Sequence, residues 1–203
     1  VMAFKDDFAD GTLAPWTQLE SGTVALLNDS THGWVLRKTS NNDPHGGQAP
    51  LGVNLRDFEL VLFTRKVNTA GGPALRYSLT DSAGNGYGFY ISSAATLHIE
   101  RRNNWSGTAL AVSSTALTGG VELGAWYTLR LFRQGSNLSA EAYAGRVDPG
   151  TAIPVLSVSA SDDNFSRFDQ LNVNGGRDFD TDRICVYVEA AQVQPGMVFE
   201  DDF

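Results

Sequence analysis

The sequence of 203 residues has a single cysteine, Cys185. One cysteine cannot form an intramolecular disulfide, so packing and hydrogen bonds alone must hold the fold. The chain also lacks an apolar run long enough to cross a membrane and a basic-then-apolar start typical of a signal peptide. We therefore expect no membrane partner and synthesis in the cytoplasm, with action on a virion or outside the cell only after lysis or dedicated export.

Basic residues are also scarce relative to acidic ones. Lys and Arg number 15 against 23 Asp and Glu, which gives a formal net charge of −8, and no basic run offsets it. Because an acidic surface repels phosphate backbones, the composition argues against a nucleic-acid partner. Hydrophobic residues make up 42% of the chain and aromatic residues 10%, which is enough to fill the core of one domain of this length.

Helical periodicity is scarce too, whereas strand signals recur along the whole chain. The 21 glycines gather in turn sequences such as DSAGNGYG and NVNGG, with alternating or apolar runs between them. An antiparallel all-β protein of about ten or more strands favours a two-sheet sandwich over an open sheet. The runs predict strands at 23–28, 34–38, 58–67, 74–80, 87–92, 96–102, 126–133, 138–145 and 183–190.

Three stretches give this pattern a family resemblance. DDFADGTLAPW resembles the opening of laminin G-like and concanavalin A-like jelly rolls, and WYTLRLFRQGSNLSAEAYAG and DFDTDRICVYVEA resemble a Trp-led hairpin and the Asp-bearing last strand of such domains. The resemblance covers nearly the whole chain in pattern. It implies a two-sheet antiparallel jelly-roll β-sandwich over 1–190, in a superfamily that mostly binds glycans and includes glycosidases, lyases and virion proteins.

Alternation along the strands assigns polar side chains to one face of a predicted sheet. Aromatic rings beside hydrogen-bonding groups suit a sugar, whose CH faces stack while its hydroxyls take directional bonds. The alternative is a solvated face held by cross-strand Arg–Glu pairs. If the strands are neighbours, this face collects Arg76, Tyr90, His98, Glu100, Arg102, Arg130, Glu141 and Tyr143.

The stretch RRNNWSG places Asn104 and Trp105 at a predicted hairpin tip. A tryptophan among polar loop residues is a good stacking platform for a ligand, and the alternative is a lid folded over the end of the sandwich. Trp16, Trp34 and Trp126 occupy strand-like positions, so we expect them in the core.

Catalytic motifs are missing from the sequence. A glycosidase needs two carboxylates roughly 5–9.5 Å apart, and the strand acids here are isolated, although Glu100 and Glu141 could face each other across a sheet. His98 with Tyr90 and two arginines is a weaker hypothesis, for a lyase. We therefore predict a non-catalytic module that recognises glycans or a surface, such as a phage virion decoration or tail adhesion protein. A glycan-cleaving enzyme and a purely structural capsid-surface protein are the alternatives.

The motif FKDDF near the start of the chain returns as FEDDF at its end. The tail at 191–203 has three interpretations: a strand of the same sheet, the start of a second repeat, or an arm that pairs with another copy or with a capsid or tail protein. We favour the arm, because RICVYVEA already resembles a closing strand.

Alternation in the first motif puts Asp6 between two core phenylalanines, where a carboxylate must be paired, hydrogen-bonded or metal-bound. The resemblance implies a structural Ca²⁺ where the first and last strands meet, with Asp6, Asp7 and Asp182 as its side-chain ligands. Asp182 ends a D-x-D-x-D run with Asp178 and Asp180, whose other interpretation is an acidic turn.

Overall fold

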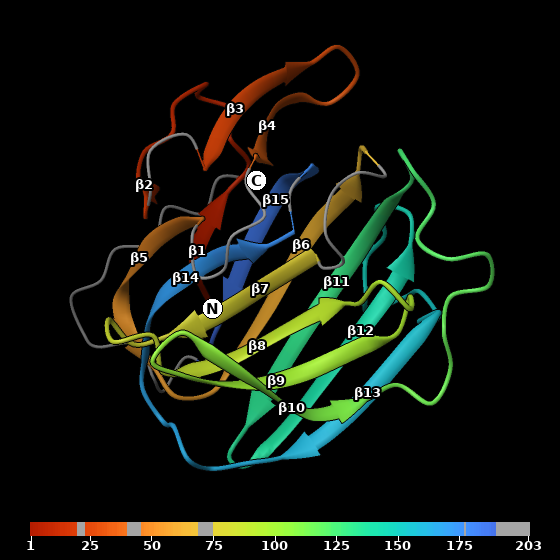
Figure 1. The fold of residues 1–203 in the computed structure, drawn as a ribbon. Coiled ribbons are helices and arrows are strands. Elements are labelled where there is room, and N and C mark those ends of the chain that lie inside the picture. Colours follow the sequence, from red (N-terminus) through yellow and green to blue (C-terminus); the bar gives the residue numbers. More distant parts are fainter. Residues whose placement is uncertain (20–22, 40–45, 69–74, 177, 190–203) are drawn as a thin grey trace.

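The computed structural model describes residues 1–19, 23–39, 46–68, 75–176 and 178–189. These residues form two antiparallel β-sheets packed face to face, and the described part of the chain contains no helix (Figure 1). The strands are β1 (Met2–Asp6), β2 (Thr17–Gln18), β3 (Val24–Asp29), β4 (Gly33–Lys38), β5 (Gly47–Leu55), β6 (Phe58–Lys66), β7 (Leu75–Thr80), β8 (Gly86–Ile91), β9 (Leu97–Asn103), β10 (Ser106–Val112), β11 (Trp126–Gln134), β12 (Asn137–Ala144), β13 (Leu156–Ser161), β14 (Phe168–Gly175) and β15 (Phe179–Tyr187).

One sheet has eight strands and the other has seven. The eight-stranded sheet runs in the order β13-β12-β11-β6-β15-β4-β3, with β1 paired to β15. The seven-stranded sheet runs in the order β10-β9-β8-β7-β14-β5-β2. In Figure 1 the strands β7 to β10 lie in front of β6, β11 and β12, so the chain leaves the front sheet after β10 and continues in the back sheet.

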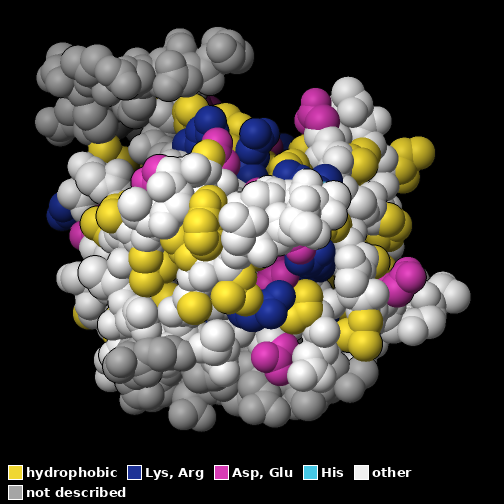
Figure 2. Space-filling model, turned by 90° about the horizontal axis from the view of Figure 1, so that it is seen from above, with side chains coloured by type: hydrophobic (Ala, Val, Ile, Leu, Met, Phe, Trp, Pro, Cys, Tyr) yellow, Lys and Arg dark blue, Asp and Glu magenta, His cyan; other side chains and the backbone are white. Residues whose placement is uncertain are grey.

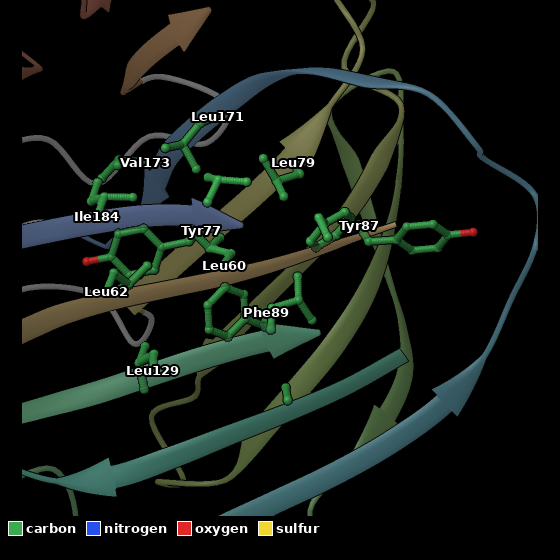
Figure 3. Packing of buried hydrophobic residues seen from close by; sticks show 14 of the residues in the cluster. Leu60, Leu62, Tyr77, Leu79, Tyr87, Phe89, Leu129, Leu171, Val173 and Ile184 are labelled. Carbon is green, nitrogen blue, oxygen red and sulfur yellow. The ribbon is translucent and has the colours of Figure 1, made fainter. Parts of the chain in front are cut away.

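The core lies between the two sheets and follows the predicted alternation. Tyr77 and Phe89 of the front sheet are fully buried, as are Leu60, Leu62 and Leu129 of the back sheet. Figure 3 shows these side chains filling the space between the layers. Because successive strand residues point to opposite faces, the side chains between them in sequence lie on the outer faces of the sandwich.

Each of the nine predicted strands corresponds to a strand of the structure. The sequence did not predict β2, β5, β10, β13 and β14. Strand β5 contains Pro50 and Gly52, which weaken a strand signal, and its partner β2 pairs only with Gly47 and Gln48. Pro50 therefore lies beyond the β2 pairing, in the position where a strand tolerates a residue without an N–H.

The two ends of the described chain meet. Strand β1 pairs with β15, and the amino group of Val1 donates a hydrogen bond to the Val188 carbonyl oxygen at 2.7 Å. The first and last described strands are thus neighbours in one sheet. The predictions for the tail at 191–203 lie outside the described residues and stay predictions. No helix in the described ranges is long and apolar enough to span a membrane.

Candidate functional site

The prediction that eight polar residues share one face is wrong. Strands β7, β8 and β9 belong to the seven-stranded sheet, whereas β11 and β12 belong to the eight-stranded sheet. Alternation sorts residues within a strand but does not reveal that the connection from β10 to β11 crosses between sheets. Arg76, Tyr90, His98, Glu100 and Arg102 therefore lie together on the outer face of the seven-stranded sheet, which we call the front face. The others, Arg130, Glu141 and Tyr143, lie on the outer face of the eight-stranded sheet, which we call the back face.

Three side chains stack across neighbouring strands of the front face. Arg76, Tyr90 and His98 are register partners on β7, β8 and β9. The rings of Tyr90 and His98 are 4.5 Å apart and inclined by only 15°, and the Arg76 guanidinium carbon is 4.6 Å from the centre of the Tyr90 ring. Because Tyr90 lies between its two neighbours, its ring faces are covered. The phenol hydroxyl and the ring edge are what it presents to a ligand.

Glu100 lies flat on the same sheet, held by two arginines. One carboxylate oxygen is 2.7 Å from Arg102 Nη1 and 3.3 Å from Arg76 Nε, and the residue is only 2% exposed. A Cβ atom on Gly107 would lie 2.5 Å from Glu100 Oε2, and one on Gly88 would lie 3.0 Å from Oε1. The absence of side chains at these two glycines makes room for the carboxylate.

Burial sets the protonation of the stack. Burial lowers the pKa of His98, with the opposing effect of Glu100 and a further lowering by the Arg76 charge. Burial also raises the pKa of Tyr90, and the Glu100 charge adds to this. The imidazole is therefore neutral and the phenol protonated at neutral pH, and both are suited to hydrogen bonds with hydroxyl groups.

The Trp105 hairpin tip forms one end of the front face. Asn104 and Trp105 have φ angles of 48° and 68°, as in a two-residue hairpin turn. The tip docks on the β7–β8 turn: Trp105 N–H donates to the Gly84 carbonyl oxygen at 3.1 Å, and Asn104 N–H donates to Asn85 Oδ1 at 2.9 Å. The indole lies against Gly84, where a Cβ atom would come within 2.5 Å of it. Asn104 is exposed and Trp105 is half-buried, so the ring leans on a neighbouring hairpin and remains partly accessible.

Further polar side chains of the front face come from β7 and β14. Asn172 is the register partner of Ser78, and Asn174 that of Arg76. Asn172 Nδ2 donates to Thr80 Oγ1 at 2.9 Å. The remaining atoms Asn172 Oδ1, Ser78 Oγ and both polar side-chain atoms of Asn174 are buried without a hydrogen-bond partner. Buried polar groups are normally satisfied, so this unused capacity marks a place for ordered water or a ligand. The asparagines were missed because β14 was not predicted as a strand.

The back face uses its charges in ion pairs. Asp180, whose side chain is fully buried, contacts Arg37 Nε at 2.6 Å and Arg65 Nη2 at 2.9 Å. Arg65 also pairs with Asp29 at 2.5 Å. Asp180 and Asp182 lie within β15, so the interpretation of the D-x-D-x-D run as a turn is wrong for both. Figure 2 shows basic side chains lying beside acidic ones on the surface seen from above.

A second group on the back face surrounds Arg130. Its guanidinium contacts Glu59 at 2.7 Å and Glu141 at 3.0 Å, and the Tyr143 hydroxyl donates to Glu141 at 2.5 Å. Glu100 and Glu141 therefore lie on outer faces of different sheets. They cannot flank one glycosidic bond, so the prediction that they face each other is wrong.

Of the four tryptophans, only Trp16 is in the core as expected, at 5% exposed; Trp34 is half-buried against the core. Trp126 lies on the back face instead. The Arg65 guanidinium is 4.7 Å and the Arg146 guanidinium 5.4 Å from its ring. Strand β11 alternates Trp126 out and Tyr127 in, which a strand-like position alone does not settle.

The acidic residues predicted to hold calcium are engaged elsewhere. The Asp6 carboxylate accepts hydrogen bonds from Phe8 N–H at 2.8 Å and Trp16 Nε1 at 2.7 Å, and its burial raises its pKa. These two donors satisfy the carboxylate between the phenylalanines without a metal.

Asp7 pairs with Lys5 at 3.2 Å, and Asp182 forms an ion pair with Arg146. Within the described ranges no group of three or more His, Cys, Asp or Glu side chains is arranged to hold a metal ion. The three predicted ligands do not fit a shared Ca²⁺.

Comparison with known proteins identifies the architecture. No family model matches the chain. An uncharacterized protein of Methanocaldococcus jannaschii is 28% identical over 190 residues, which is 90% of this chain and 18% of that protein. The chain thus spans less than a fifth of that relative's length.

Among solved structures, the carbohydrate-binding module CBM66 of Bacillus subtilis has a TM-score of 0.55 at 18% identity, covering 83% of this chain and 91% of that one. The lumenal domain of VIP36, bound to Ca²⁺ and Man3GlcNAc, has a TM-score of 0.57 at 10% identity, covering 89% and 87%. The fold is a concanavalin A-like jelly roll. A GH43 protein of Bacillus licheniformis matches with a TM-score of 0.58 at 12% identity, over 91% of this chain but only 39% of that protein.

Proposed function

We propose that this chain is a non-catalytic glycan-recognition module whose site is the front face. The observation that carries the proposal is the unused hydrogen-bonding capacity there, at Ser78, Asn172 and Asn174, beside the Arg76–Tyr90–His98 stack. Sugars are recognised by directional bonds to hydroxyls combined with aromatic contacts. The back face, in contrast, uses its charged groups in ion pairs.

The fold supports this assignment without deciding it. A carbohydrate-binding module and a mannose-oligosaccharide-bound lectin domain share the architecture. Fold similarity at such low identity transfers no ligand, so the argument rests on the residues of the front face. Recognition of a polysaccharide-covered surface is the coarser form of the virion adhesion or decoration role expected from the sequence.

The arrangement of carboxylates favours binding over cleavage. Glu100 is 2% exposed and held by two guanidiniums, which keeps it from serving as a free acid or base. Its predicted partner Glu141 lies on the other sheet. Among the residues that the structure describes, the front face therefore offers no pair of carboxylates for glycoside hydrolysis.

A glycan microarray with the purified chain tests the proposal. Two matched variants remove one hydroxyl each: Tyr90→Phe on the front face and Tyr143→Phe on the back face. Trp105→Ala removes the partly exposed ring. We expect weaker binding for Tyr90→Phe and Trp105→Ala and unchanged binding for Tyr143→Phe. Running the array with calcium and with EDTA should give equal signals, because the three predicted calcium ligands are otherwise engaged.

A blank array under both conditions would overturn glycan recognition. Binding that is weakened by Tyr143→Phe and unaffected by Tyr90→Phe would place the site on the back face and contradict the assignment. Release of reducing ends from a bound polysaccharide would contradict the non-catalytic part of the proposal.

A further inference from the structure

The charges of the front face are unbalanced. In the described part of the chain, the ionised side chains on the outer side of these strands are Arg76 and Arg102 against Glu100, and burial keeps His98 neutral at pH 7. A local positive excess on a protein of net charge −8 calls for an explanation. The back face has no such excess around its centre, because Asp180 and Asp29 together balance Arg37 and Arg65.

Arg76 is the arginine of the front face that reaches solvent. Its side chain is 18% exposed, whereas that of Arg102 is fully buried. Its guanidinium is held against the Tyr90 ring and Glu100, so its orientation is fixed before a ligand arrives. A planar guanidinium with a fixed orientation is well suited to bind a carboxylate through paired hydrogen bonds.

The neighbours of Arg76 complete such a site. Asn174 is its register partner on β14, is fully buried and has an amide with no hydrogen-bond partner at either atom. Ser78 and Asn172 add a hydroxyl and an amide oxygen on the next register row. A cation beside neutral donors and acceptors matches a sugar ring that carries one carboxylate and several hydroxyls, reached directly or through bridging water.

We propose that the front face recognises uronic-acid-containing polysaccharides and that Arg76 binds the carboxylate. This inference rests on the proposed glycan recognition and adds its substrate class. The overall negative charge opposes it only weakly, since charges beyond about 8 Å are largely screened at physiological ionic strength, whereas a contact pair is not. One surplus cation is too little for a polyphosphate ligand, whose affinity depends on many neutralised phosphates.

Polygalacturonate and alginate test this inference, each compared with the same polymer after chemical reduction of its carboxyl groups. Binding is measured by isothermal titration calorimetry at low and high salt. We expect at least about tenfold tighter binding of one acidic polymer than of its reduced form, since a hydrogen-bonded charge pair contributes that much or more. Added salt should narrow the difference.

Three variants locate the effect. Arg76→Gln should abolish the preference for the acidic polymer, Arg76→Lys should retain part of it, and Arg130→Gln on the back face should leave it unchanged. Circular dichroism and the thermal midpoint check that each variant folds, and Glu100 keeps its Arg102 partner in the Arg76 variants.

The outcomes separate the two proposals. Equal binding of acidic and reduced polymers, a preference that survives Arg76→Gln, or array binding to neutral glycans alone would overturn the uronate inference and leave glycan recognition standing. Failure to bind either polymer together with a blank array would overturn both.

Discussion

Each outer face of the sandwich holds a buried carboxylate between two arginines, and their surroundings differ. On the back face Asp180 contacts Arg37 and Arg65, and Arg65 pairs onward with Asp29. On the front face Glu100 contacts Arg76 and Arg102 on a floor of glycines, next to asparagines with unused hydrogen-bonding capacity. The back network is complete within the protein, which marks it as structural. The front network is complete only with water or a ligand.

The comparison predicts that stability depends most on the back face. Asp180→Ala removes the partner of two arginines and should lower the free energy of unfolding by about 3–5 kcal/mol, the range for breaking a buried ion pair. Glu141→Ala is the matched control, because its side chain is 24% exposed and such pairs contribute at most about 1 kcal/mol. Urea denaturation measures both. Equal losses for the two variants would contradict the ranking.

The glycine floor of the front face offers the next largest effect. The Cβ atom of Gly107→Ala would lie 2.5 Å from Glu100 Oε2, so the carboxylate must move. We expect a loss of about 1–3 kcal/mol in unfolding free energy, as for overpacked sites, and weaker glycan binding through the displaced Arg76. A double variant with Glu100→Ala should recover part of the stability, because the clash is gone. Strictly additive losses would show that Glu100 does not occupy that space.

The sequence predicted the sandwich well because alternation and turn residues are local signals. It predicted the inward side of β7, β8, β9, β11 and β12, and it brought Arg76, Tyr90, His98, Glu100 and Arg102 into one group that the structure keeps. It failed where the answer depends on non-local pairing. The crossing from β10 to β11 separates Arg130 and Tyr143 from that group, and no property of either strand signals it.

The calcium prediction failed for a related reason. A carboxylate among phenylalanines requires a partner, and the sequence indicated this requirement for Asp6 correctly. The partner is Trp16, ten residues away, and the Phe8 N–H. Which of several possible donors satisfies a buried acid is a matter of three-dimensional packing.

Removing single hydroxyls sharpens the contrast between the faces. Tyr143 donates a 2.5 Å hydrogen bond to Glu141, so Tyr143→Phe should lower the unfolding free energy by about 1 kcal/mol and leave glycan binding unchanged. Tyr90→Phe should do the reverse, weakening binding with a smaller effect on the urea midpoint. A larger stability loss from Tyr90→Phe than from Tyr143→Phe would show that the front-face hydroxyl is structural.

The smallest effect concerns His98 and pH. Because burial lowers its pKa in the folded state, the unfolded chain binds a proton more readily, beginning near pH 6.5. The neutral imidazole therefore favours folding above that pH, and this contribution is lost as the pH falls toward the folded-state pKa. We expect the urea midpoint of the wild type to drop more between pH 7.5 and 5.5 than that of His98→Gln. The two proteins share all other titrating groups, so identical drops would mean that His98 titrates alike in both states, and the neutral stack on the front face would have to be abandoned.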